Sequence, residues 1–390
     1  MAWLNNRNRY REGFPDCLEA FRKLPDPRQS PATRHYFGEI LFIALAATIS
    51  GMEGFEDMEV FSREREEWLR GHLELPNGLP SADTYARVFA AIDPEPFMEC
   101  FVEMVSSRCP AVSGELIAID GKTLRRSGTR GGRRALHVIS AWAGSRGITL
   151  GQLAVAEKSN EITAVPKLLR CLKLKDCVVS LDAMGCQHRT AVAIGHAGAD
   201  WLLALKGNQG TLHDGAVELF ADTESLKWIN HQGGAVDLHE HTDAGHGRVE
   251  ERRLCVTDHL DWIAPAERRK WMGLRSVICV ESIRHLPGEE PAVSKRYWLT
   301  SLPPDAERLL ALVRGHWGIE NRCHWVMDVV FNEDQSRVRT RNAAKNLSLL
   351  RRLSHNLLQT SSELAGKSVR SKRLAAALNP QRLEKFLGLA

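Results

Sequence analysis

The sequence predicts a mixed α/β fold in which helices cover a sheet of parallel and antiparallel strands. Three observations support this class. The first hundred or so residues carry apolar positions at helical spacing. From Glu115 the pattern changes to short, β-branched apolar runs, and these then alternate with helical segments. We therefore expect a helical N-terminal domain followed by an α/β domain.

Composition sets the limits of this prediction. A chain of 390 residues can bury a sizeable core and suggests two or three domains, and 43% hydrophobic with 26% charged residues is typical of a globular protein. Nine scattered cysteines without a CxxC pair favour neither a disulfide framework nor a cysteine zinc site. The longest apolar run, at residues 40–50, is shorter than the roughly 20 residues that span a bilayer. No secretory leader is evident, so we expect a cytoplasmic protein with no membrane partner.

The helical domain is expected over residues 1–110. Helical spacing recurs at 38–52, 55–73 and 80–92, and Ser81 is a plausible N-cap for the last of these. The turn LPNGLP between two of these helices resembles a helix-turn-helix, which would bind DNA. A plain helical packing domain is an equal alternative.

The α/β domain is expected to begin over residues 111–210. Five apolar strands are predicted there, at residues 116–120, 134–144, 148–157, 177–185 and 200–206. The tight SRG segment at 145–147 predicts a hairpin between the second and third strands. A helix is predicted between the third and fourth strands and another before the fifth.

The rest of the chain divides into three predicted parts. Residues 211–300 read as a β-rich insertion, and residues 301–345 complete the α/β domain with a helix that Asp305 caps. Residues 346–390 form a basic helical tail. Although the net charge is only +4, the segment from Gln335 to the end holds twelve Lys or Arg against two acids. This asymmetry favours a surface that faces nucleic acid, and a solvated basic helix without a partner is the alternative.

Two aspartates follow predicted buried strands. Asp120 ends the run LIAID, Asp182 ends VVSLD, and the carboxyl ends of neighbouring parallel strands meet at one ligand-binding edge. Carboxylate oxygens are the ligands that Mg²⁺ prefers, with water and phosphate completing its coordination. Either aspartate alone could simply start a turn, but the matched pair favours a metal site.

A third acid is expected from the helix at 305–328. Glu320 lies on one face of this helix with His316 and His324, each four residues away. The plainer interpretation is a surface ion pair between Glu320 and His316 or Arg314. The rival third ligands lie at or beyond the predicted end of the helix, and they are Asp328, Glu333 and Asp334.

Six motifs in order resemble those of one known family. They are AIDGKTLRRS, VVSLDAMGCQ, LLALKGNQ, GHGRVEERR, LTSL and RGHWGIENRCHWVMDVVFNED. Together they resemble the H-repeat-associated branch of the bacterial insertion-sequence DDE transposases. The resemblance extends to the N-terminal helices and covers most of the chain.

The resemblance implies a ribonuclease H-like core whose catalytic, metal-binding residues are Asp120, Asp182 and Glu320. It further implies Mg²⁺, or Mn²⁺ in its place, as cofactor. In this family water cuts at the element end, and the freed 3′ hydroxyl then attacks target DNA. The implied partners are double-stranded DNA, as terminal inverted repeats and target, and a second copy of the chain in the paired-end complex. The implied location is the nucleoid in the bacterial cytoplasm.

Basic and polar side chains near these acids are the predicted DNA contacts. They are Lys122, Arg125, Arg126, Arg133, Arg134, Lys206, Asn208, His316, Arg337, Arg339 and Lys345. For Lys206 and Asn208 a plain turn is the equal alternative. Trp298 and Trp317 are candidates for stacking on an unpaired base, although core packing is favoured for both.

One departure from the wider family concerns the surroundings of Glu320. The family often places a tyrosine, an arginine and a lysine there, where this sequence has Val313, His316 and Met327. Lys345 or Arg337 could take the role of the missing lysine. Two other functions share the same acids or the same fold: a metal-dependent nuclease without strand transfer, and a domesticated DNA-binding protein without catalysis.

Overall fold

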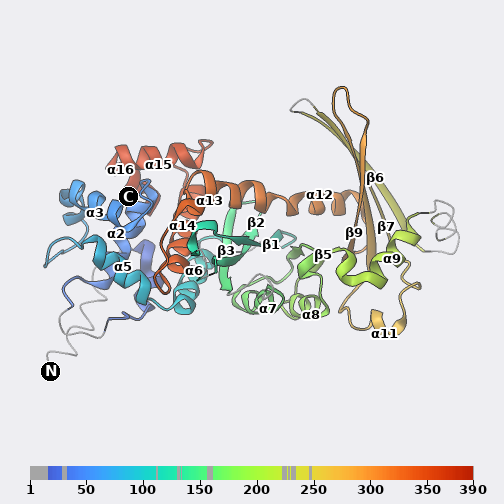
Figure 1. Ribbon diagram of the computed structural model, residues 1–390, viewed down its shortest axis with the longest axis horizontal. Coiled ribbons are helices and arrows are strands. Elements are labelled where there is room, and N and C mark those ends of the chain that lie inside the picture. Colours follow the sequence, from blue (N-terminus) through green and yellow to red (C-terminus); the bar gives the residue numbers. More distant parts are fainter. Residues whose placement is uncertain are drawn as a thin grey trace.

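The computed structural model describes residues 16–28, 33–110, 113–129, 132, 134–155, 161–221, 226, 229, 234–245 and 248–389. The molecule is elongated, with helices at one end, a sheet flanked by helices in the middle, and long strands projecting at the other end (Figure 1). Among the described residues, no helix combines the length and the apolar character that crossing a membrane requires.

The N-terminal helices form a packed layer at one end. They are η1 (Asp16–Lys23), α2 (Phe37–Ile49), α3 (Phe55–Glu64), α4 (Glu66–Arg70), α5 (Ala82–Ala91) and α6 (Pro94–Arg108). All thirteen residues of α2 are buried, which explains why its sequence is apolar on every side. Ser81 precedes α5 as predicted, but its hydroxyl contacts the Thr84 hydroxyl at 3.2 Å and makes no cap bond to the backbone.

Nine strands form one continuous sheet in the order β3-β2-β1-β4-β5-β9-β8-β7-β6. Their bounds are β1 (Leu116–Thr123), β2 (His137–Ala143), β3 (Ile148–Val155), β4 (Val178–Leu181), β5 (Asp200–Leu205), β6 (Val236–Gly245), β7 (Arg248–Thr257), β8 (Ser276–His285) and β9 (Ala292–Thr300). Strands β3, β2 and β1 are antiparallel neighbours, and β1, β4 and β5 are parallel. This half of the sheet has the ribonuclease H-like order, so the predicted fold class is confirmed.

The remaining strands extend the same sheet. Strand β9 pairs antiparallel with β5, joining Leu202 to Thr300, and β8, β7 and β6 follow as an antiparallel series. Residues predicted as a β-rich insertion therefore continue the same sheet. Within the described residues, this region also contains the helices α9 (Gly210–Leu219) and α11 (Pro265–Arg268).

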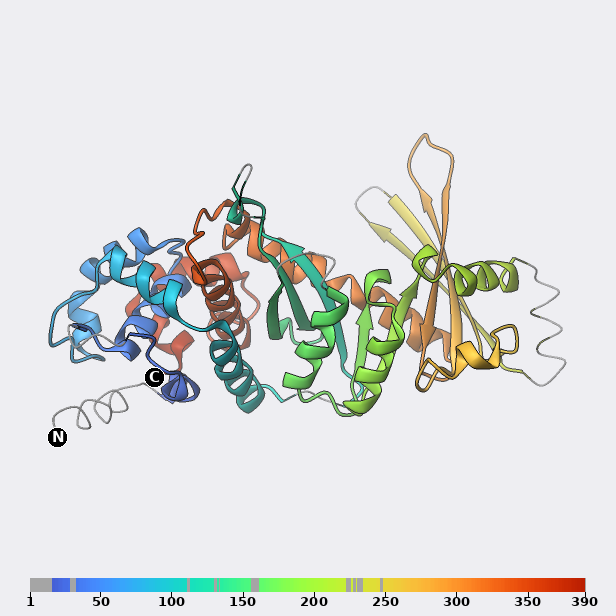
Figure 2. The ribbon, with the colours of Figure 1, turned by 60° about the horizontal axis from the view of Figure 1, so that its bottom comes forward.

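Helices cover both faces of the ribonuclease H-like half. Because successive side chains of a strand point to opposite faces, Ile117 and Ile119 of β1 belong to the main core, which also contains residues of α7 (Glu161–Cys171) and α8 (His188–His196). Residues of the opposite face, such as Val178 and Leu202, pack against α12 (Ala306–His316). Figures 1 and 2 show α7 and α8 on one side of the sheet and α12 running along the other.

The C-terminal helices return to the N-terminal layer. These are α14 (Ala343–Thr360), α15 (Val369–Leu378) and α16 (Pro380–Leu387), and all three contact α2. Several cations of the predicted basic tail are buried, namely Arg351, Arg352, Lys372 and Arg373. For these four side chains the expectation of a nucleic-acid-facing tail is wrong, because they hold interior carboxylates and backbone carbonyls.

Candidate active site

The two predicted aspartates lie at neighbouring positions of the parallel strands β1 and β4. Asp182 directly follows β4, but the prediction that Asp120 ends its strand is wrong, because β1 continues to Thr123 in its pairing with β2. Strands β1 and β4 pair with Ile119 opposite Leu181, so the next residues along the register are Asp120 and Asp182. By strand alternation both share the sheet face of Ala118, which packs against Ile319 and lies under the segment that carries Glu320.

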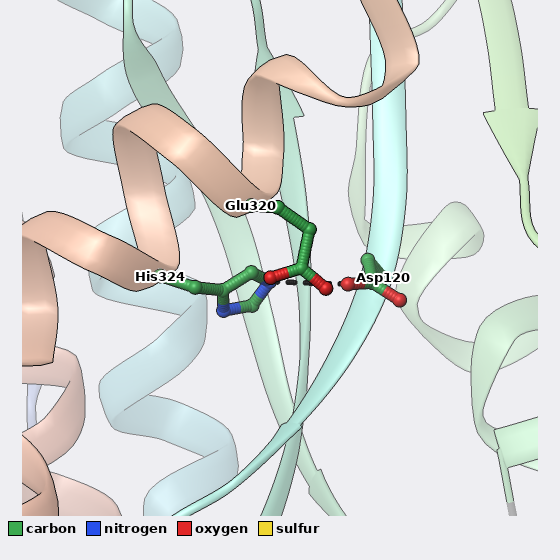
Figure 3. Close-up of side chains that lie close together, drawn as sticks. All are labelled: Asp120, Glu320 and His324. Carbon is green, nitrogen blue, oxygen red and sulfur yellow. Dashed lines mark ion pairs between the residues drawn. The ribbon is translucent and has the colours of Figure 1, made fainter. Parts of the chain in front are cut away.

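Glu320 begins a single turn of π-helix. Helix α12 ends at His316, the π-helical turn η6 covers Glu320–His324, and α13 (Trp325–Val329) follows. Such π-helical turns are frequent at functional sites. Here the turn directs Glu320 and His324 toward Asp120, as Figure 3 shows. Oxygens of Asp120 and Glu320 and a ring nitrogen of His324 all lie within 4.8 Å of one another.

The chemistry of this group fits a divalent cation. His324 is 4% exposed, and neither of its ring nitrogens has a hydrogen-bond partner among the described residues. Its Nε2 lies 3.4 Å from Asp120 Oδ2, close enough for electrostatic attraction but too long for a good hydrogen bond. A buried, unsatisfied imidazole beside two carboxylates is the donor set of a metal site with mixed oxygen and nitrogen ligands.

The charges of the site perturb its carboxyl groups. Burial and the nearby charge of Asp120 raise the pKa of Glu320. Burial also raises the pKa of Asp182, to which the charges of Asp120 and Glu161 add. Burial acts the same way on Asp120, but His324, the backbone N–H of Gly121 and Glu320 together lower the pKa of that group below its ordinary value. A cation bound between these carboxylates would reduce their mutual repulsion and stabilise their ionised forms.

Asp182 is held in a turn of its own. One of its carboxylate oxygens, Oδ1, accepts hydrogen bonds from the backbone N–H groups of Met184 and Gly185 at 3.0 and 3.3 Å. Asn208 Nδ2 donates to Ala183 O at 2.7 Å and so ties the loop after β5 to this turn. Asp182 is therefore beside Asp120 in the sheet but outside the tight group that Asp120, Glu320 and His324 form.

The rival acids gather around Lys122 instead of Asp120. Lys122 Nζ forms an ion pair with Asp328, and it lies 3.4 Å from Glu333 Oε2 and 3.3 Å from Asp334 Oδ1. Glu333 is itself fully buried, and Arg352 Nη1 donates to its Oε1 at 2.8 Å. This network fastens β1, two residues beyond Asp120, to the chain that follows η6.

His316 and Lys345 lie away from an open surface. His316 is 5% exposed and forms a 2.9 Å hydrogen bond with the Ser180 hydroxyl, so this side chain faces the interior and not a phosphate. Lys345 is half-buried and lines a cavity of about 520 Å³ between α6, β3 and α14. Met327, at the position of the family's lysine, is fully buried.

Most other predicted DNA contacts are exposed. The exposed side chains are Arg125, Arg126, Arg134, Lys206, Asn208 and Arg337. Arg339 is half-buried, and its Nε donates to Arg126 O at 3.0 Å. Arg133 lies outside the described residues. Of the two tryptophans, Trp298 is 2% exposed and belongs to the core, whereas Trp317 is 45% exposed.

His324 is the residue that the sequence interpretation did not assign to the site. Its spacing of four from Glu320 was the available signal, since that spacing places both side chains on one helical face. The spacing alone does not reveal that the ring is buried or that it has no hydrogen-bond partner among the described residues. These two properties distinguish a metal ligand from a surface histidine.

The strand order, the two aspartates on neighbouring parallel strands and the glutamate on the later helical segment are those of a ribonuclease H-like domain of the DDE class. The chain belongs to the DDE transposase family: the family described as "Transposase DDE domain" matches residues 113–357. A second family, described as "DDE_Tnp_1-associated", matches the helical residues 18–105. The protein is thus an enzyme of the transposase and nuclease type.

Relatives of similar length support this membership. The chain is 38% identical over 373 residues to "Putative transposase YncI" of Escherichia coli O157:H7, covering 95% of this chain and 94% of the relative. It is 37% identical over 374 residues to "H repeat-associated putative transposase YhhI" of Escherichia coli K12, covering 95% and 97%. A solved piggyBac transposase synaptic complex with hairpin DNA aligns with 97% of this chain and 80% of its own at a TM-score of 0.42 and 10% identity. That likeness is too low to bear on activity.

Proposed function

We propose that this protein is the transposase of an insertion sequence, cutting DNA at the element ends and joining the freed 3′ ends to target DNA. Family membership and the placement of Asp120, Asp182 and Glu320 support this function. The partners are double-stranded DNA at the terminal repeats and at the target, with a homodimer holding two ends together.

Asp120, Glu320 and His324 would hold a divalent ion, Mg²⁺ or Mn²⁺, and Asp182 would contribute from the neighbouring strand. A bound ion of this kind lowers the pKa of water and stabilises charge on phosphoryl oxygens. The fold holds the proposed ligand side chains in position for such an ion. Asp120 is fixed by its strand, Glu320 and His324 are fixed by the π-helical turn, and the Lys122 network holds the two segments together.

The single observation that carries the proposal is the convergence of Glu320 and His324 on Asp120 across about 200 residues of sequence. An acid that only paired on the surface with His316 or Arg314 would not point at Asp120 in the sheet. Arg314 instead pairs with Asp243, and His316 bonds Ser180.

Asp120→Asn tests the assignment. The change removes a charge from the metal group while keeping the shape of the side chain. We expect Mg²⁺-dependent cleavage and joining of element-end DNA to fall by more than the roughly 10- to 100-fold that loss of outer-sphere support costs. Mn²⁺ binding, measured by calorimetry, should weaken in parallel, whereas DNA binding without metal should persist.

Asp261→Asn is the matched control, because that side chain is 83% exposed and lies in the insertion. Its activity should equal that of the unmodified protein. Full cleavage by Asp120→Asn would refute the metal site. Cleavage without 3′-end joining by the unmodified protein would identify the nuclease alternative, and DNA binding without cleavage would identify a domesticated binding protein.

A further inference from the structure

Strands β6 to β9, which extend the sheet, have two unlike faces next to the C-terminal part of α12. On one face, residues of β7, β8 and β9 and the end of α12 line a groove of about 560 Å³. The register shows a row of side chains across its floor, with Arg252 beside Ser282 and Ser282 beside Ser294. The groove also reaches Asn321, the residue after Glu320.

The groove is lined by small side chains and by arginines. Ser282, Ala292 and Ser294 keep the floor low, so a ligand backbone can approach the sheet closely. Arg284 and Arg296 are exposed, and within the described chain neither forms an ion pair with an acid. The groove therefore offers two exposed guanidinium groups that form no ion pair within the described residues, and two hydroxyls, with Glu250 at the strand position opposite Arg284.

Two further arginines of the groove are already neutralised. Arg252 pairs with Asp243 and Glu250, both at 2.7 Å, and Arg314 also pairs with Asp243. Their ion pairs brace the floor, whereas Arg284 and Arg296 have no ion pair among the residues that the structure describes. Arg296 is held in place by the ring of Trp317, whose centroid lies 5.2 Å from its guanidinium carbon.

The opposite face of the same strands is electrically different. There Arg253 lies near Glu240, Glu251 and Glu281, and Lys295 lies 3.6 Å from Glu281. Arg253 and Lys295 are both matched by acids, so on the described part of this face neither cation is free to bind a polyanion. The difference between the two faces shows that the arginines of the groove are not simply the ordinary charge of a solvated strand.

We propose that this groove binds the sugar–phosphate backbone of the DNA strand that leads to Glu320, with Arg284 and Arg296 contacting phosphates. The inference rests on the proposed function and adds the place where DNA approaches the acids. Arginine is suited to bidentate phosphate contacts, and serine hydroxyls commonly donate to phosphate oxygens. Trp317, whose ring contacts Arg296, lies three residues before Glu320.

The test compares charge removal on the two faces. The groove variant is Arg284→Gln with Arg296→Gln, and the matched control is Arg253→Gln with Lys295→Gln on the other face of the same strands. Binding of the full chain to a random-sequence duplex of about 30 base pairs is measured by fluorescence anisotropy without metal, over a series of KCl concentrations. The logarithm of the binding constant falls with log[KCl], and each lost phosphate contact makes this slope less steep by about 0.9. The slope of the groove variant should therefore be less steep by about 1.8, and that of the control should be almost unchanged.

An unchanged slope for the groove variant, or an equal change in both variants, would overturn the groove while leaving the transposase proposal intact. An unmodified protein that shows no salt-dependent DNA binding would overturn both. Melting temperatures check that each variant folds, and surface substitutions of this kind should change stability by less than about 0.5 kcal/mol.

A second measurement does not depend on charge. A photoreactive p-benzoylphenylalanine is placed at Ser294, in the groove, or at Lys295, its neighbour on the opposite face. DNA should crosslink to position 294 and not to position 295, because adjacent residues of a strand point to opposite faces. Equal crosslinking at both positions, or crosslinking at 295 alone, would reject the groove.

Discussion

The two halves of the nine-stranded sheet differ in what covers them. Strands β3, β2, β1, β4 and β5 are enclosed by α7 and α8 on one face and by the segment from α12 to α14 on the other. Helix α12 also packs on part of β6 to β9, but the parts of these strands that it leaves uncovered carry exposed residues on both faces. Leu238 and Val293 are 59% and 58% exposed on one face, and Arg284 and Arg296 are exposed on the other. One sheet thus contains an enclosed part and a part that is open to a partner.

This difference separates two requirements. Acids that hold a metal must be positioned within fractions of an ångström, and a packed interior with few rotamers available provides this. Side chains that contact a long polyanion need access, and electrostatic attraction tolerates looser placement. The ion pairs follow the same division: Glu333 with Arg352 is fully buried, whereas Glu281 with Lys295 is at the surface.

The largest expected effect comes from the buried ion pair. Glu333→Gln leaves Arg352 without its interior counter-charge and removes one of the three acids around Lys122, and breaking such a buried pair typically costs about 3–5 kcal/mol of unfolding free energy. Glu281→Gln is the same change in the open half, where exposed pairs contribute about 0–1 kcal/mol. Urea unfolding of both variants measures the difference. Equal losses would remove the contrast between the halves.

Acid pH should reveal the same group. Burial alone would raise the pKa of Glu333, but the charges of Arg352 and Lys122 lower it to about 2, against 4.5 for an unperturbed glutamate. A lowered folded-state pKa stabilises the protein above pH 4.5, and this contribution disappears as the pH falls toward 2. The unmodified protein should therefore lose stability between pH 5 and pH 3 more steeply than Glu333→Gln. Parallel curves in urea titrations at several pH values would contradict the assignment.

The smallest expected effect concerns the loop that supports Asp182. Asn208→Ala removes the hydrogen bond to Ala183 O and should cost about 0.5–1.5 kcal/mol of stability. It should also weaken Mn²⁺ binding, because the Asp182 turn loses a fixed point. Asn77→Ala, which removes a comparable amide bond to Arg34 O in the helical layer, should lower stability without changing Mn²⁺ affinity. Equal affinities in the two variants would show that Asn208 supports only the fold.

The sequence was sufficient to predict the fold class and to select the acids for local reasons. Asp120 and Asp182 each follow a short apolar run, and Glu320 lies on a helix with a buried stripe, all of which are readable from neighbouring residues. The structure places the aspartates at adjacent register positions and turns Glu320 toward Asp120. Their catalytic role remains a prediction.

Features that depend on distant partners were not predictable in this way. The pairing of β5 with β9 joins residues about a hundred positions apart, so the continuity of the sheet leaves no local pattern. Arg352 looks like part of a basic tail until its partner Glu333 is found inside the core. The charge count was correct, but it could not distinguish a cation that meets DNA from a cation that meets a buried acid.

The packing of α14, α15 and α16 against α2 has a consequence for biosynthesis. Helix α2 is apolar all round and leaves the ribosome early, but the helices that complete its burial are the last to be made. For most of translation the nascent chain therefore exposes a hydrophobic helix to solvent. Such a helix can bind a chaperone and can start aggregation. Premature termination near the 3′ end of the message would remove helices that pack on α2. The truncated product would then expose α2 and be degraded.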